Sequence, residues 1–410
     1  MTNNRIVATG MGAITPIGIG VASYWDNLIK GKSGVTAISR FDVNELPVKI
    51  AAEVKDFKPT DFLARKVASQ TDIFAQFALI AAAEAIEQSH LKAAPERVGI
   101  VIGTAFGGLT TAIEAQEQIS NSGSYRISPR VVPNSLGNIA AAHIGILHNL
   151  RGPSLTVTTA CSSGGDAIGV GTMMLKSGQA DAVVVVGAES TLFGMMNASL
   201  AASRALSQRN DDPAKACRPF DLERDGFVMG EGGGALVIET LDHAKKRDAE
   251  IKAEILGYGN CSDSYHITAP HPEGRGEIQC MEIALKNANL EPAQIEYINA
   301  HGTSTPMGDK IETETIKAVF GQRAKDIPVS STKGATGHMM GAGGVTELIA
   351  CIQAIREGIL PPTLNYEIPD PQCDLDYVPN TARNTDIKIA MSNSFGFGGQ
   401  NTSLIIGRYE

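Results

Sequence analysis

Short runs of consecutive apolar residues alternate along the chain with segments in which apolar residues recur every three or four positions. The runs predict buried β-strands, and the recurring positions predict helices with an apolar face. Strands are expected at residues 5–11, 97–102, 155–159, 182–186, 235–239, 252–258, 295–300, 327–330, 387–391 and 402–407. Helices are expected at residues 23–30, 71–90, 138–147, 167–175, 276–288 and 344–356. Residues 198–234 are expected to be long and irregular, which in a compact enzyme usually indicates function.

The order of predicted elements in the first part of the chain returns in the second part. Loop 103–108 corresponds to 301–308, the turn at Cys161 to 333–338, segment 187–190 to 393–399, and segment 232–239 to 398–406. We therefore predict an internal duplication, with α/β halves at residues 1–250 and 251–410. Alternating strands and helices predict largely parallel sheets covered on both faces, with ligands at the loops that leave the strand ends.

Composition and charge narrow the functional classes. The 410-residue chain has a net charge of −9, which argues against a nucleic-acid-binding protein. No apolar run reaches the length of a membrane span, and the first residues lack the apolar core of a signal peptide. The six cysteines form no C-x-x-C pair, so neither a zinc site nor a disulfide framework is expected. We expect a reduced, cytoplasmic protein without a membrane span or a nucleic-acid partner.

Cys161 follows a β-branched run and precedes small residues and an apolar segment. This pattern predicts a buried strand, a tight turn and a helix, with the cysteine at the helix N-terminus. The helix dipole and free N–H groups there favour a thiolate, which suits covalent catalysis. The alternative is that Cys161 is a small buried apolar residue, and this stretch alone leaves both interpretations open.

Other unusual residues follow other predicted strands. His301 lies in Asn299–Thr305, His338 ends Ser331–His338, and Gly396–Gly399 is a glycine-rich turn with exposed N–H groups. By the duplication, these loops should reach the same place as Cys161. We therefore expect one site that combines a nucleophile, two histidines and backbone donors.

At these motifs the chain resembles the β-ketoacyl-ACP synthases of the thiolase superfamily, and among them the 3-oxoacyl-[acyl-carrier-protein] synthase II type. The resemblance covers essentially the whole chain. It rests on Thr159–Gly164, Arg218–Asp221, Arg224–Phe227, Asn299–Thr305, Ser331–His338, Pro361–Thr363 and Asn393–Gly399. It implies a thiolase-like fold with a layered αβαβα core, and a dimer.

The resemblance also implies a reaction. Cys161 accepts an acyl chain from acyl carrier protein as a thioester, malonyl-ACP loses CO2, and the resulting carbanion attacks the thioester to give 3-oxoacyl-ACP. His301 and His338 would donate hydrogen bonds to the oxygen that becomes negative on decarboxylation. The backbone N–H groups of Cys161 and Phe397 would form the oxyanion hole of the acyl thioester. No cofactor is expected beyond the phosphopantetheine arm of the carrier protein.

Lys333 and Glu347 match positions that support the family's site. Lys333 would order the site and tune His338, with a solvated loop lysine as the alternative. Glu347 would be a buried acid that pairs with Lys333. Alternatively, it would join Asn299 and Asn393 around a monovalent cation, and the sequence suggests no other metal.

Further residues match the family's substrate channel. Thr303 and Thr305 would bind the pantetheine arm, with ordinary turn capping as the alternative. Thr268 would form a wall of the same channel. Phe397 would gate the entry of the acyl chain, and Phe395 is also expected to contact substrate.

Three departures from the family pattern bear on the substrate. Phe106 stands where relatives often carry a smaller aliphatic residue in the acyl pocket. Arg130–Pro133 replaces a more aromatic stretch that lines the partner's pocket. The start of the helix at residues 65–70 is less basic than usual for a protein that docks an acidic carrier. The remaining cations are Arg65, Lys66, Arg126, Arg130 and Arg204.

These departures leave other interpretations open. The chain could be the ketosynthase subunit of a type II polyketide or polyene synthase, paired as a heterodimer with a chain-length-factor subunit, instead of a homodimer in fatty-acid synthesis. A non-catalytic partner subunit would typically lack the cysteine, so Cys161 with both histidines argues against it. A degradative thiolase would use a second cysteine as base, where this chain has His338 and the Phe397 loop.

Overall fold

The computed structural model describes residues 5–410 and confirms most of the predicted elements within a few residues. The strands of the main sheet are β1 (Ile6–Thr15), β2 (Gly18–Ile19), β5 (Val98–Gly103), β6 (Ser154–Val157), β7 (Ala182–Glu189), β8 (Gly232–Thr240), β9 (Ala253–Ser262), β10 (Tyr297–Asn299), β11 (Val329–Ser330), β14 (Ile389–Gly396) and β15 (Gln400–Gly407). Two short ribbons are β3 (Thr36–Ala37) with β4 (Ile50–Ala51) and β12 (Ile359–Leu360) with β13 (Arg383–Asn384).

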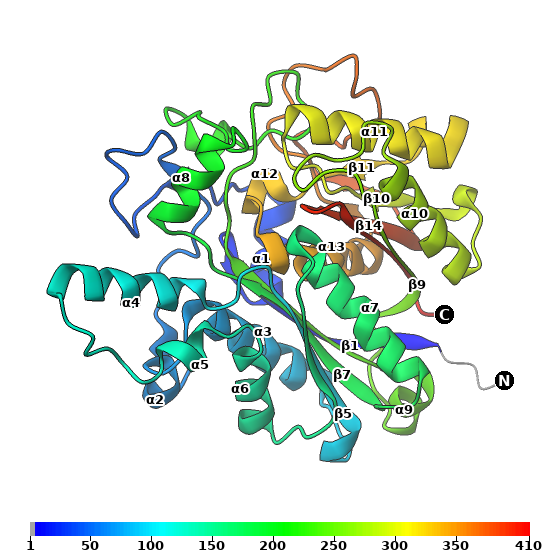
Figure 1. Ribbon diagram of the computed structural model, residues 1–410. Helices are drawn as coiled ribbons and strands as arrows, with labels where there is room; N and C mark the ends of the chain where they lie inside the picture. Colours follow the sequence, from blue (N-terminus) through cyan, green and yellow to red (C-terminus); the bar gives the residue numbers. More distant parts are fainter. Residues whose placement is uncertain (1–4) are drawn as a thin grey trace.

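Helices surround and divide this sheet (Figure 1). They are α1 (Val21–Ile29), α2 (Arg65–Ala68), α3 (Ile73–Ser89), α4 (Leu109–Ser122), α5 (Val131–Ser135), α6 (Ile139–His148), α7 (Ser163–Lys176), α8 (Gly194–Ala202), α9 (Leu241–Lys246), α10 (Arg275–Ala288), α11 (Pro306–Phe320), α12 (Lys333–Thr336) and α13 (Gly343–Glu357). Among residues 5–410, no helix combines the length and the apolar character needed to cross a bilayer.

The sheet repeats one strand order in mirror image, as expected for a duplicated unit. One half runs β6-β5-β7-β8-β1 and the other runs β9-β15-β14-β10-β11. The halves join where the first residues of β1 pair antiparallel with the start of β9. Equivalent strands therefore end in equivalent places, and the loops that carry the motifs converge.

The sheet is mixed, so the expectation of largely parallel pairing was wrong. In each half the first strands pair in parallel, β5 with β6 and β7 and β10 with β11 and β14. The last strands pair antiparallel, β8 with β7 and β1 and β15 with β14 and β9. Only the short glycine-rich turn separates β14 from β15, and a turn of that length can only reverse the chain into a hairpin.

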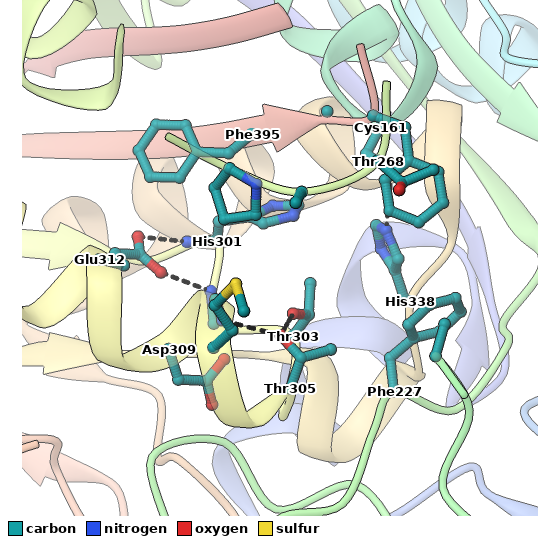
Figure 2. Close-up of a pocket in the computed structure, with 18 of the residues that line it drawn as sticks. Cys161, Phe227, Thr268, His301, Thr303, Thr305, Asp309, Glu312, His338 and Phe395 are labelled. Carbon is teal, nitrogen blue, oxygen red and sulfur yellow. Dashed lines mark hydrogen bonds between the residues drawn. The ribbon is translucent and has the colours of Figure 1, made fainter. Parts of the chain in front are cut away.

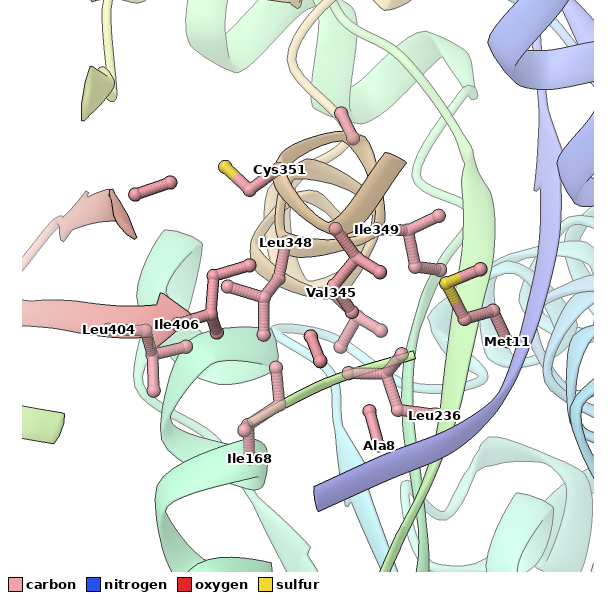
Figure 3. Close-up of a cluster of buried hydrophobic side chains, with 14 of the residues drawn as sticks. Ala8, Met11, Ile168, Leu236, Val345, Leu348, Ile349, Cys351, Leu404 and Ile406 are labelled. Carbon is pink, nitrogen blue, oxygen red and sulfur yellow. The ribbon is translucent and has the colours of Figure 1, made fainter. Parts of the chain in front are cut away.

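Two helices lie between the halves of the sheet and form its central layer. Along β7, Val183 and Val185 pack in the cluster around α7 and α13, whereas Val184 and Val186 pack against α3 and α6. Helices α10 and α11 cover the outer face of the other half. Figure 3 shows side chains of α13 lying between β8 and β15. The result is five layers in the order αβαβα.

The two central helices touch at glycines. A β-carbon added at Gly344 would lie 2.5 Å from the backbone nitrogen of Gly165, and one at Gly164 would lie 2.7 Å from the carbonyl oxygen of Gly341. Real β-carbons do not approach backbone atoms this closely. The absence of side chains there allows the starts of α7 and α13 to meet backbone to backbone.

Several details differ from the sequence-based expectations. Helices α4, α5, α11 and α12 were not predicted, and α8 occupies the first residues of the segment expected to be irregular. Strand β6 was expected to be buried, but it is the edge of the sheet and Leu155 is 51% exposed. An edge strand that carries exposed apolar side chains has the same sequence pattern as a core strand, so the sequence did not distinguish the two.

Candidate active site

Cys161 lies in a 3₁₀ turn, Ala160–Ser162, immediately before α7, as the sequence predicted. Ala160 has a left-handed φ of 52°. The buried carboxylate of Asp166 accepts hydrogen bonds from five side chains around this turn. The donors are Thr159 (2.6 Å), Ser162 (3.4 Å), Tyr258 (2.8 Å), Asn260 (2.8 Å) and Thr402. Because the last three belong to β9 and β15, the other half of the molecule holds the nucleophile turn in place.

The structure brings the two predicted histidines to Cys161. Nε2 of His338 lies 3.0 Å from the Cys161 sulfur. The His301 ring lies 5.4 Å from the His338 ring, centroid to centroid, at an angle of 86°. Figure 2 shows the three side chains around one cavity. The edge of Phe227 packs against His338 at 5.3 Å.

A carboxylate that sequence reasoning missed holds the His301 turn. The two carboxylate oxygens of Glu312 accept the backbone N–H groups of His301 (2.8 Å) and Gly302 (2.7 Å) (Figure 2). Glu312 lies on α11, which was not predicted. An acid two turns into a helix that follows a motif histidine is the signal that could have identified it.

The glycine-rich turn after β14 approaches the nucleophile closely. A β-carbon at Gly396 would lie 2.8 Å from the carbonyl oxygen of Thr159 and 3.3 Å from the backbone nitrogen of Cys161. The backbone N–H of Phe397 acts on the Cys161 sulfur and lowers the pKa of the thiol. Two backbone donors, those of residues 161 and 397, therefore lie beside the sulfur. The Phe397 side chain is 40% exposed, and Phe395 packs 5.8 Å from His301.

Lys333 is a buried cation next to these groups. Its ammonium nitrogen lies 2.5 Å from Oε1 of Glu347, and both side chains are at most 4% exposed. Burial lowers the pKa of both His301 and His338 well below the ordinary value, and the charge of Lys333 lowers both further. The two imidazoles are therefore neutral at physiological pH.

The sulfur is a thiol at rest, which corrects the expectation of a thiolate. Burial raises the pKa of Cys161 to about 11, although the Phe397 N–H and the Lys333 charge act in the opposite direction. Loss of solvent is the largest influence on the pKa of this thiol. The resting pair is a thiol beside a neutral imidazole, so an attacking Cys161 needs His338 as a base.

The cavity has a volume of about 370 Å³. Of the predicted site residues, it is lined by Cys161, Thr268, His301, Thr303, Thr305, His338, Phe395 and Phe397. Four carboxyl side chains that the sequence did not single out also line it: Asp263, Glu277, Asp309 and Glu312. Phe106 does not line the cavity. Its side chain is 44% exposed, and its backbone N–H donates to Glu189.

Thr303 and Thr305 both lie on the cavity wall, and their contact with the pantetheine arm stays a prediction. Their hydroxyl oxygens lie 3.1 Å apart on the cavity wall, and Thr305 also caps α11 by accepting the backbone N–H of Gly308. Capping does not remove Thr305 from the cavity. Thr268 holds its own loop by bonding to Nδ1 of His266.

The three residues predicted to surround a monovalent cation offer one unpartnered oxygen. Oδ1 of Asn299 is buried without a hydrogen-bond partner, whereas Oδ1 of Asn393 accepts from Ser403 at 2.8 Å and Glu347 pairs with Lys333. Within residues 5–410, no cluster of three or more His, Cys, Asp or Glu is arranged to hold a metal. The cation remains a prediction, which the free oxygen of Asn299 fits.

The chain resembles known proteins along its whole length. Family models described as the N-terminal and C-terminal domains of beta-ketoacyl synthase match residues 3–244 and 252–367. A curated relative from Coxiella burnetii, named 3-oxoacyl-[acyl-carrier-protein] synthase 2, is 46% identical, with 100% of this chain and 99% of the relative covered.

Two solved structures resemble the chain throughout. The ishigamide ketosynthase/chain length factor has a TM-score of 0.92 at 34% identity. A type II polyketide ketosynthase in complex with its acyl-carrier protein has a TM-score of 0.91 at 33% identity. Each comparison covers 99% of this chain and 100% of the other. These neighbours confirm the predicted thiolase-like fold.

We expect iodoacetamide to alkylate Cys161 slowly at neutral pH, because its pKa of about 11 leaves little thiolate. The rate should rise about tenfold per pH unit up to that pKa, since the thiolate is the reactive form. Lys333→Met removes a charge that favours the thiolate and should lower the rate at each pH below it. Mass spectrometry of peptides distinguishes Cys161 from the half-buried Cys261. A Cys161 rate independent of pH would contradict a resting thiol.

Proposed function

Because the chain belongs to the β-ketoacyl synthase family, we propose that it condenses acyl-ACP with malonyl-ACP to give 3-oxoacyl-ACP and CO2. It is a condensing acyltransferase, and the proposal places it in chain elongation of type II fatty-acid synthesis. The observation that carries the proposal is the contact of 3.0 Å between Cys161 and His338, with His301 beside them. No cofactor is required apart from the phosphopantetheine arm on which the substrates arrive.

In the first half-reaction, Cys161 attacks the carbonyl carbon of the acyl thioester. Nε2 of His338 takes the thiol proton as the C–S bond forms, and the backbone N–H groups of Cys161 and Phe397 bind the developing oxyanion. The pantetheine sulfur then leaves and takes the proton from His338. The acyl chain stays on Cys161 as a thioester, and both imidazoles are neutral again.

In the second half-reaction, malonyl-ACP enters and loses CO2. Charge develops on its thioester oxygen, where His301 and His338 donate hydrogen bonds. Their low pKa values fit this task, because a neutral imidazole can donate without placing a second cation beside Lys333. The resulting carbanion attacks the acyl thioester and expels the Cys161 thiolate, which takes up a proton before the next cycle.

The solved complex of a ketosynthase with its acyl-carrier protein supports the same kind of partner here. We propose that the carrier protein docks over the mouth of the cavity, where Arg204 lines the wall. Arg65, Lys66, Arg126 and Arg130 are also exposed. Thr303 and Thr305 would then meet the amides of the pantetheine arm inside the channel.

The open edge of the sheet supports a homodimer. Strand β6 has a free edge and carries the half-exposed Leu155, and Ile146 and Leu147 at the end of α6 are also exposed. An unpaired, apolar edge strand is a template for pairing with another chain. We propose that β6 pairs with its own copy. The alternative heterodimer, in a polyketide system, is less favoured because identity is 46% to the synthase 2 relative and 33–34% to the polyketide neighbours.

Purified protein should convert acyl-ACP and malonyl-ACP into 3-oxoacyl-ACP. His301→Ala should lower CO2 release from malonyl-ACP by about 10²–10³-fold, because one donor to the oxyanion is lost, and should leave acylation of Cys161 nearly unchanged. His338→Ala should lower both steps, because this imidazole also takes the thiol proton. CO2 release and the mass of the acyl-enzyme measure the two steps, with Cys161→Ala as the control without an adduct. Normal decarboxylation in both histidine variants would disprove the assignment.

We expect Phe106→Ala to shift substrate preference toward longer acyl chains. A phenylalanine in place of a smaller residue overfills a packed pocket, which typically costs about 1–3 kcal/mol. For the use of long acyl chains this is roughly a tenfold or larger penalty. Phe106 is half-exposed and belongs to the loop after β5, the strand that pairs with β6, so its contact with the acyl chain would require the assembled dimer. Competition among acyl-ACPs of increasing length measures the shift. An unchanged profile in a stable variant would leave Phe106 without a role in chain length.

Leu155→Asp should convert the dimer into a monomer. The side chain is 51% exposed in the single chain, so a charge is tolerated there, but pairing of β6 with its copy would bury two like charges together. Sedimentation equilibrium measures the mass in solution. Leu222→Asp is the matched control, since Leu222 is 50% exposed and lies away from β6. A variant that stays dimeric would contradict pairing through this edge.

A further inference from the structure

Glu277 is a buried carboxyl on the cavity wall that the proposed chemistry does not use. It lies in the first turn of α10, is 3% exposed, and lines the cavity together with Cys161 and His301. A carboxyl in this position is costly to keep unless it serves the cavity, since burying an acid removes its hydration.

The acidic groups that face Glu277 favour its neutral form. The Thr315 hydroxyl, 3.0 Å from Oε2, acts in the opposite direction and lowers the pKa of Glu277. The titratable neighbours are Glu312 on α11, Asp263 after β9 and Cys261 on β9, and each of them opposes a negative charge on Glu277. Burial is the largest cause and raises the pKa of Glu277 well above the ordinary value. Cys280 lies on the same helix, and its thiol supplies no positive charge that would favour the Glu277 carboxylate.

Glu312 differs from Glu277 although both line the cavity. Burial raises the pKa of Glu312 to about 7, but its two oxygens receive backbone N–H groups and the charge of Lys333 also favours the carboxylate. The Thr315 hydroxyl bonds the Glu277 carboxyl at 3.0 Å and the backbone carbonyl oxygen of Glu312 at 2.9 Å, so it bonds the backbone of Glu312 and not its side chain. Of the two acids, Glu312 is the better placed to carry a negative charge, because two backbone N–H groups of the His301 turn donate to its carboxylate.

We propose that Glu277 is a specificity-determining residue for the malonyl substrate, whose own carboxylate must enter this cavity. As an uncharged acid, Glu277 adds a polar wall without a second negative charge next to Glu312. When ionised, it repels the malonyl carboxylate but not the uncharged acyl group. This inference rests on the proposed function, because only that reaction brings a carboxylate to the site.

The expected signature is a Michaelis constant for malonyl-ACP that rises about tenfold or more toward alkaline pH, as Glu277 loses its proton. The constant for acyl-ACP should not rise in parallel. Glu277→Gln keeps the shape of the side chain and cannot ionise, so its malonyl constant should stay flat over the same range.

Steady-state kinetics on the purified dimer test this, with CO2 release and acyl-enzyme mass recorded separately. Glu282→Gln is the matched control, since Glu282 is exposed on the same helix, and it should keep the wild-type rise. If Glu277→Gln folds poorly, Glu277→Met provides the same test without an ionisable group. An alkaline rise that persists in these variants, or is absent from the wild type, would overturn the inference. Absence of condensation in the wild type at neutral pH would instead refute the proposed function.

Discussion

The buried charge of Lys333 is the constraint on which the site depends. One carboxylate, Glu347, compensates it at 2.5 Å, and its remaining field acts on groups that cannot be solvated. Both imidazoles stay neutral in that field, and the thiol becomes easier to ionise than burial alone would allow. A neutral imidazole is the form that can accept the thiol proton and later donate to an enolate. Burial is the largest influence on all three groups, and this one ammonium group lowers the pKa of each of them.

A second set of contacts, between the two duplicated halves, fixes the positions of the proposed catalytic residues. Asp166 belongs to the half that carries the nucleophile, yet three of its five donors come from β9 and β15. The histidines come from the second half and the sulfur from the first. Relative movement of the halves would therefore change the Asp166 bonds and the Cys161–His338 distance together. The catalytic geometry is as rigid as the joint between the two copies.

The sequence predicted those elements in which apolar residues are buried and polar residues are exposed. Val183–Val186 is apolar at every position because both faces of β7 are covered, and the strand was predicted correctly. Helix α11 was missed because Asp309 and Glu312 are buried there and accept backbone N–H groups, which reverses the usual pattern. The motifs predicted that Cys161, His301 and His338 meet at one site, and the structure places all three at one cavity; their catalytic roles stay predictions. The protonation state of Cys161 depends on how completely the fold excludes water from the thiol. No local sequence pattern indicates this.

The contact of α7 and α13 at Gly164, Gly165 and Gly344 bears on how such a chain can evolve. After a duplication, each copy is free to acquire its own loops, and here one acquired a nucleophile and the other the histidines. At the crossing that freedom ends, because a methyl group on one helix would collide with the main chain of the other. A substitution there would need a compensating change of backbone path in the opposite copy, which no single mutation supplies. The two copies are therefore inherited as one unit, whatever chemistry their outer loops come to perform.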